Sequence, residues 1–148
     1  MPAEQSTMPR GVDTDLYLEI QQFYAAQMQA LDGGDATGWA ETFTEDGVFA
    51  TNADSSATCG RAAIAQAAHA AAARLAEEGL VQRHWLGMLD ARPGPDGGVR
   101  VRYYALVIRT PGGGDPVIWR SCAGADELVR HDGGWLVRER RITRDDVG

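Results

Sequence analysis

A histidine interrupts the apolar run at residues 81–88, VQRHWLGM. Because successive side chains of a β-strand point to opposite faces, a strand here would place His84 beside Leu86 and Met88. Imidazole titrates near pH ~6.5 and can move protons at cellular pH. Burying it among apolar groups costs free energy unless it has a partner or a task. We therefore expect His84 to face a pocket as a general acid or base, the alternative being a core histidine bonded to a backbone carbonyl.

The other two histidines are expected to be solvated. His69 lies on an Ala-rich segment away from its apolar stripe, and His131 precedes an Asp-Gly-Gly turn. No spacing of His, Cys, Asp or Glu resembles a metal site. The sequence therefore predicts neither a metal ion nor a cofactor.

Hydrophobic periodicity predicts the elements that must position His84. Apolar residues recur at helical spacing after Asp13, a good N-cap, as far as the DGGD at 32–35. The following segments are expected to be a short helix at 35–43, a brief strand near 48–51 and an Ala-rich helix at 60–79. After Gly79 the period changes to two, in four runs separated by Gly-rich turns: 81–91, 99–110, 117–130 and 135–144.

This order of elements predicts an α+β fold, with N-terminal helices packed on one face of a curved, mainly antiparallel sheet. A sheet wrapped around helices leaves a cone, whose apolar interior suits a small-molecule ligand. The length of 148 residues fits a polar, flexible arm at 1–12 and one domain at 13–148.

The charge and the apolar content exclude several classes of partner. The net charge of −7 repels phosphate backbones, so nucleic acid is not an expected partner. No segment resembles a signal peptide or approaches the ~20 apolar residues of a membrane span. We therefore expect a cytoplasmic protein.

Several stretches of the chain resemble the nuclear-transport-factor-2-like superfamily, and within it the SnoaL-like branch. They are FYAAQMQALDGGDATGWAETFTEDGVFAT, GRAAIAQ, RHWLGM and DELVRHDGGWLVRERRI, and the resemblance spans roughly residues 13–144. It implies a cone-shaped fold. The superfamily includes polyketide cyclases, steroid isomerases, scytalone dehydratase and non-catalytic dioxygenase β subunits, so function must be argued from the site.

Three positions carry over from these enzymes by resemblance. QRHWLG is similar to the scytalone dehydratase stretch that holds an active-site histidine, which falls on His84. The acid that ends that enzyme's first helix and orients a catalytic histidine falls on Asp32. Asp126 matches the steroid isomerase position that holds a protonated carboxylic acid in the oxyanion hole.

Neither enzyme's complete mechanism is present. The general base of steroid isomerase falls on Thr51 and its oxyanion tyrosine on Gln27, while the second histidine of scytalone dehydratase has no counterpart. Tyr24, one turn before Gln27, could supply a phenol from the same helix face.

The sequence thus predicts a cofactor-independent cyclase, dehydratase or isomerase acting on a polyketide-type intermediate. His84 would move the proton, Asp32 would hold it, and Asp126 or Tyr24 would stabilise an enolate oxygen. Residues expected to contact the substrate are Gln27, Trp39, Phe49, Thr51, Leu86, Met88, Tyr104 and Trp119. The alternative is a non-catalytic ligand-binding protein or a subunit resembling a dioxygenase β chain.

Two further expectations concern the sheet surface. The RERR at 138–141 is interpreted as an alternating strand with a solvated or dimer-facing surface rather than as an anion site. Trp85, on the strand face opposite His84, and exposed candidates such as Val137 predict a homodimer, because the uncovered sheet face needs burial.

Overall fold

The computed structural model describes residues 10–148, so most of the arm expected at 1–12 lies outside the described residues. The helices are α1 (Thr14–Asp32), α2 (Ala36–Ala40) and α3 (Arg61–Glu78), with a short 3-10 helix, η1 (Pro95–Gly97). The strands are β1 (Phe43–Thr51), β2 (Thr58–Cys59), β3 (Leu80–Pro93), β4 (Val99–Pro111), β5 (Val117–His131) and β6 (Gly134–Arg144).

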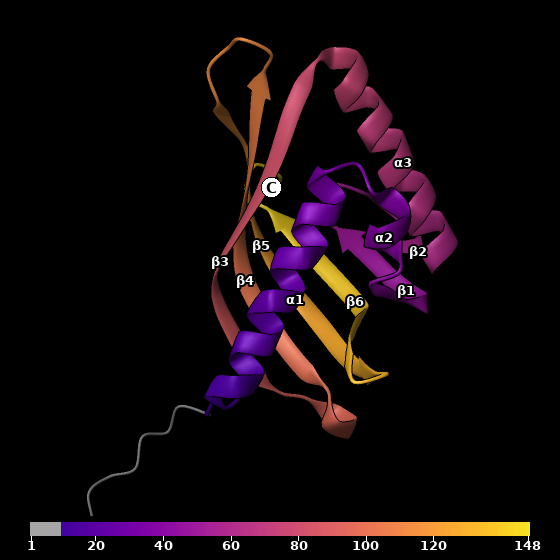
Figure 1. Ribbon diagram of the computed structural model, residues 1–148, viewed down its shortest axis with the longest axis vertical. Coiled ribbons are helices and arrows are strands. Elements are labelled where there is room, and N and C mark those ends of the chain that lie inside the picture. Colours follow the sequence, from indigo (N-terminus) through magenta and orange to yellow (C-terminus); the bar gives the residue numbers. More distant parts are fainter. Residues whose placement is uncertain (1–9) are drawn as a thin grey trace, which may run out of the picture.

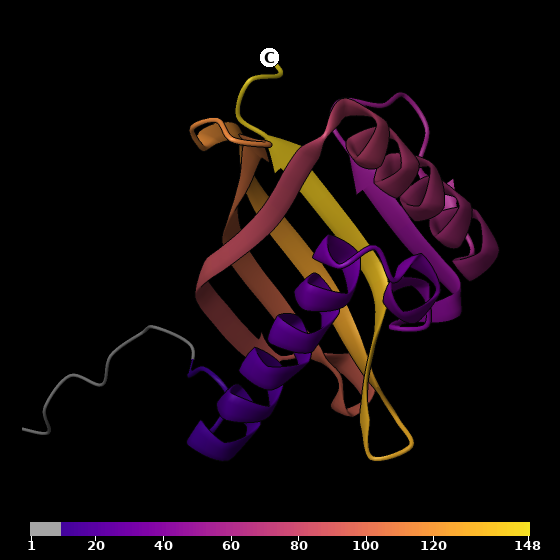
Figure 2. The same ribbon diagram turned by 45° about the horizontal axis from the view of Figure 1, so that its top comes forward.

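The strands form one curved sheet in the order β2-β1-β6-β5-β4-β3. Figures 1 and 2 show α1 lying across one face of this sheet, with α2 and α3 beside β1. The expected α+β architecture is confirmed, because the four long strands follow one another as antiparallel neighbours. The sheet is mixed, however, since β1 pairs with β6 in parallel.

Local signals explain where the helices begin and end. The Asp13 carboxylate accepts a hydrogen bond of 2.9 Å from the backbone N–H of Leu16 and so caps α1. Gly79 ends α3 with a left-handed φ of 65°, which glycine adopts without steric cost.

β1 is longer than the brief strand expected near 48–51. Its register with β6 shifts between Phe43 and Val48. The polar residues between them therefore break the alternation of apolar and polar residues by which a strand is recognised in a sequence. Pairing with β6, rather than a local apolar pattern, extends this strand to Phe43.

The core fills the space between the helices and the inner face of the sheet. Its most deeply buried apolar residues include Ile20, Phe43, Val101, Leu128 and Val137. The expectation of an exposed Val137 is therefore wrong, because Val137 shares with Trp135 the β6 face that packs against the helices.

Strand β3 departs from simple alternation at Met88. Its register with β4 shifts between Gly87 and Asp90, and Met88 adopts a positive φ of 54°. This bulge turns Met88 to the outer face, where it is 81% exposed, and gives the inner position to Leu89. The prediction that Met88 shares a face with His84 and lines the pocket is therefore wrong.

Candidate active site

Asp32 and His84 form a two-point contact between the C-terminal end of α1 and strand β3. The ring Nδ1 of His84 lies 2.6 Å from Oδ1 of Asp32, and the backbone N–H of His84 donates to Oδ2 at 2.8 Å. The two side chains are only 18% and 8% exposed. The carboxylate thus fixes both the imidazole ring and the backbone of His84.

This contact also selects the tautomer of His84. An ionised carboxylate only accepts hydrogen bonds, so Nδ1 carries the hydrogen, and Nε2 of the neutral ring carries a lone pair. Within residues 10–148 no group forms a hydrogen bond with Nε2. The free nitrogen is the one that can accept a proton from a ligand.

His84 lines an inner cavity of about 130 Å³ between the helices and the sheet. Its walls are mostly apolar and include the predicted residues Trp39, Phe49 and Leu86. A larger groove of about 580 Å³ between α1 and β3 is lined by Asp32 and again by His84 and Leu86. His84 therefore borders both the outer groove and the inner cavity.

A fully buried ionic network forms one side of the cavity. Arg140 is 1% exposed, and its Nη2 donates to Asp126 Oδ2 at 2.7 Å and to Gln27 Oε1 at 2.8 Å. Its Nε also donates to Asp126, at 3.0 Å. Arg140 itself lines the cavity, whereas Asp126 and Gln27 lie behind it. The carboxylate and amide thus hold the guanidinium in place.

Two tyrosines complete this network. Tyr24 on α1 and Tyr103 on β4 donate their phenolic hydrogens to Asp126 at 2.7 Å and 3.1 Å. Burial raises the pKa of both phenols, and the negative charge of Asp126 raises it further. Both phenols are therefore neutral donors whose hydrogens are already used.

The terminal nitrogen Nη1 of Arg140 has a different environment. It forms no hydrogen bond with any of the residues 10–148, while the rest of the guanidinium is held by Asp126 and Gln27. Because Arg140 lines the cavity, Nη1 is available to an oxygen of a bound molecule.

Sequence reasoning missed Arg140, because the RERR at 138–141 resembles a solvated alternating strand. The register between β5 and β6 shifts beyond the Leu128–Val137 pair, so Arg138 is an extra residue and alternation restarts after it. This bulge turns Arg140 inward. The signal that could have found it is Asp126, since an inner-face acid needs a cation.

The structure does not gather every predicted residue around His84. Gln27 belongs to the buried network, and Thr51 pairs with Ile142 at the end of β1 without lining the cavity. Tyr104 is 65% exposed on the outer face of the sheet, as strand alternation requires, and so does not line the cavity. Trp119 stacks against arginines further along the inner face of the sheet.

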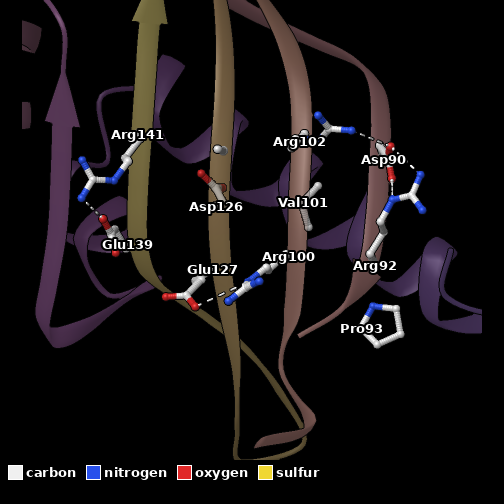
Figure 3. A pocket seen from close by; sticks show the side chains of 11 residues that line it. Asp90, Arg92, Pro93, Arg100, Val101, Arg102, Asp126, Glu127, Glu139 and Arg141 are labelled. Atoms are coloured by element: carbon white, nitrogen blue, oxygen red, sulfur yellow. Dashed lines mark hydrogen bonds and ion pairs between the residues drawn. The ribbon is translucent and has the colours of Figure 1, made fainter. Parts of the chain in front are cut away.

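Another hollow, of about 440 Å³, lies on the outer face of the sheet (Figure 3). Charged side chains line it, and they bind one another: Asp90 pairs with Arg92 and Arg102, Glu127 with Arg100, and Glu139 with Arg141. These charges therefore compensate one another across the hollow.

The described part of the chain holds no group of three or more His, Cys, Asp or Glu side chains placed to bind a metal ion. Residues 10–148 also contain no helix long and apolar enough to cross a membrane.

Comparisons with known proteins place this geometry in a family. Aln2 from a Streptomyces species is 37% identical, with a TM-score of 0.86 over 93% of this chain and 96% of that chain. ActVI-ORFA from Streptomyces coelicolor is 36% identical, with a TM-score of 0.84 over 92% and 99% of the two chains. A protein from Catenulispora acidiphila in complex with S-DNPA is 35% identical, with a TM-score of 0.80 over 90% and 96%.

A search of curated proteins gave no match. The family model for the SnoaL-like domain matches residues 13–141, which agrees with the resemblance of the quoted segments. The chain therefore belongs to the SnoaL-like domain family.

Proposed function

We propose that this protein is a cofactor-independent cyclase, dehydratase or isomerase that acts on a polyketide-type intermediate, with His84 as the proton-transfer group. The observation that carries the proposal is the Asp32–His84 contact, which fixes the ring of a histidine that lines the cavity and leaves its Nε2 without a hydrogen-bond partner in residues 10–148. The S-DNPA complex of the similar Catenulispora protein supports a small-molecule occupant.

The proposed reaction begins with proton abstraction. Nε2 of His84 takes a proton from a carbon next to a carbonyl, which leaves an enolate and an imidazolium. Asp32 stabilises the imidazolium through Nδ1–H, and Nη1 of Arg140 donates to the enolate oxygen. The imidazolium then returns its proton, either to a departing hydroxyl, which leaves as water, or to another carbon.

This assignment changes the roles expected for Asp126 and Tyr24. Tyr24 already donates its hydrogen to Asp126, and both oxygens of Asp126 accept from Arg140. We therefore propose that these two residues position Arg140 and that Arg140 carries the oxyanion contact.

The test measures proton transfer without requiring the natural substrate. The probe is 2-tetralone, a flat bicyclic ketone with acidic hydrogens beside its carbonyl, incubated with the protein in D₂O. Mass spectrometry follows deuterium incorporation. The wild type should accelerate exchange, and His84→Ala should lower this rate by ~10²–10⁴-fold with little change in the thermal midpoint.

Two further variants sharpen this test. His84→Gln keeps hydrogen bonding without proton transfer and should be nearly as slow as His84→Ala. His69→Ala, which removes an exposed histidine on α3, should exchange at the wild-type rate. Wild-type exchange in both His84 variants would overturn the assignment. Binding of S-DNPA without any exchange by the wild type would instead favour the ligand-binding alternative.

A further inference from the structure

Trp119 lies between two arginines at the far end of the inner sheet face. The guanidinium carbon of Arg109 is 3.3 Å from the centroid of the Trp119 ring, and that of Arg120 is 3.7 Å from it. Two planar groups at these distances cannot occupy the same face of one ring without overlapping. The indole is therefore stacked on both faces by cations, which fixes the orientation of the two guanidiniums on either side of it.

These two cations have no carboxylate partner within residues 10–148. Arg109 donates through Nε to Gln82 Oε1 at 2.8 Å, and Arg120 donates through Nη1 to the carbonyl oxygen of Trp119 at 3.0 Å. The Nε of Arg120 is buried and has no hydrogen-bond partner. A buried donor without an acceptor costs free energy, so the protein leaves this guanidinium incompletely satisfied.

The carboxylates near this pair act on it only through space: Asp146 interacts electrostatically with Arg120 but forms its ion pair with Arg144. Burial lowers the pKa of Arg109, and the charges of Arg120 and Arg74 lower it further, while Glu78 opposes them without forming an ion pair. Elsewhere in this acidic chain, arginines on β6 bind carboxylates directly. The Arg109–Trp119–Arg120 stack thus holds two cations that have no ion-pair partner within residues 10–148.

Strand register connects the stack to the candidate active site. Val107 is the direct partner of His84 on one side and of Arg120 on the other. Cross-strand partners share a face, so all three side chains belong to the inner face, and Val107 lines the same cavity as His84. Two strand spacings separate the backbone of His84 from that of Arg120, which is ~10 Å.

We infer that Arg109 and Arg120 bind a carboxylate of the substrate, while its ring system lies beside His84. This inference rests on the proposed function and adds the class of substrate: a flat, mostly apolar molecule whose carboxylate lies at the end remote from the reacting carbon. Guanidiniums suit this task because their planar donors match the two oxygens of a carboxylate. Trp119 keeps the guanidiniums oriented before the ligand arrives.

The experiment compares two probes that differ only in charge, 2-naphthylacetate and 2-naphthylacetamide, by isothermal titration calorimetry. The wild type should bind the acid at least ~10-fold more tightly than the amide, as expected for a charge-assisted contact. Arg120→Gln and Arg109→Gln should each reduce this preference, and the double variant should abolish it by weakening the binding of the acid more than that of the amide.

The chain offers a matched control in Arg130, which stacks over Trp135 at 4.4 Å near the opposite end of β5. Arg130→Gln should keep the full preference for the acid. Arg120→Lys keeps the charge but loses the planar donor set, and it should retain part of the preference if Arg120→Gln is too unstable to measure.

Three results would overturn the inference: equal affinity of the wild type for both probes, no binding of either probe, or a preference that survives in the double variant. His84→Ala separates this inference from the proposed function. That variant should lose deuterium exchange and still prefer the acid by the wild-type factor. If the wild type prefers the acid over the amide but does not accelerate deuterium exchange, only the catalytic proposal is contradicted.

Discussion

At the scale of single residues, the buried pair of Asp126 and Arg140 is expected to dominate stability. Asp126→Asn keeps the shape of the side chain but leaves the charge of Arg140, which is 1% exposed, uncompensated. Loss of one partner of a buried ion pair costs ~3–5 kcal/mol. Urea denaturation should therefore show a reduction of this size in the free energy of unfolding.

The matched control is Glu127→Gln, which removes a partly exposed carboxylate from the next position on β5. Its pairs with Arg100 and Arg138 lie on the outer face, where ion pairs contribute only ~0–1 kcal/mol. Equal losses in the two variants would show that Asp126 is not a charged partner of Arg140.

At the scale of elements, Asp126 on β5 joins α1 to the sheet, because it accepts hydrogen bonds from Tyr24 on α1 and from Tyr103 on β4. Burial raises the pKa of Tyr24 and Tyr103 above the ordinary value of 10.0. Above pH ~10 the unfolded chain therefore releases protons that the folded protein keeps. Because the folded state then binds more protons, the free energy of unfolding is unaffected below that pH and falls as the pH rises through it.

The urea midpoint of the wild type should fall as the pH rises through this alkaline range. The midpoint of Tyr103→Phe should fall less steeply with pH, because this variant has one fewer buried phenol. Tyr104→Phe removes an exposed phenol from the outer face and should keep the wild-type slope. If all three slopes coincide, the buried phenols do not control alkaline stability.

At the scale of the whole molecule, we predict a homodimer formed through the outer face of the sheet. Trp85 is 70% exposed there, beside the exposed side chains of Met88 and Tyr104, and together they line a hollow of about 440 Å³. A large apolar patch on an uncovered sheet face is typical of an interface. Light scattering at micromolar concentration should give twice the chain mass of 15.9 kDa.

Trp85→Glu places a charge in this patch and should shift the protein towards monomer. Leu18→Glu is the control, because Leu18 is also exposed, at 60%, but lies on α1 and not on the outer face. A wild type that scatters as a single chain would contradict the predicted dimer.

The sequence by itself determined the elements whose signals are local. Asp13 and Gly79 mark helix ends because capping and left-handed backbone depend on one residue and its neighbours. The four long strands and the inward direction of His84 follow from a period of two, which the chain carries in its own pattern. The family resemblance added Asp32 as the partner of His84, and the structure places the two in contact.

Only the tertiary structure decided which charged groups come into contact. It also decided to which face of the sheet some side chains of β3 and β6 point. The bulges at Met88 and Arg138 reverse the expected faces of Met88 and Arg140, and such bulges arise from pairing with a neighbouring strand. Asp126 receives a hydrogen bond from Tyr24 across 102 positions of sequence. No local sequence pattern predicts this contact. A charge such as that of Asp126 can be buried only because the fold brings its partners to it.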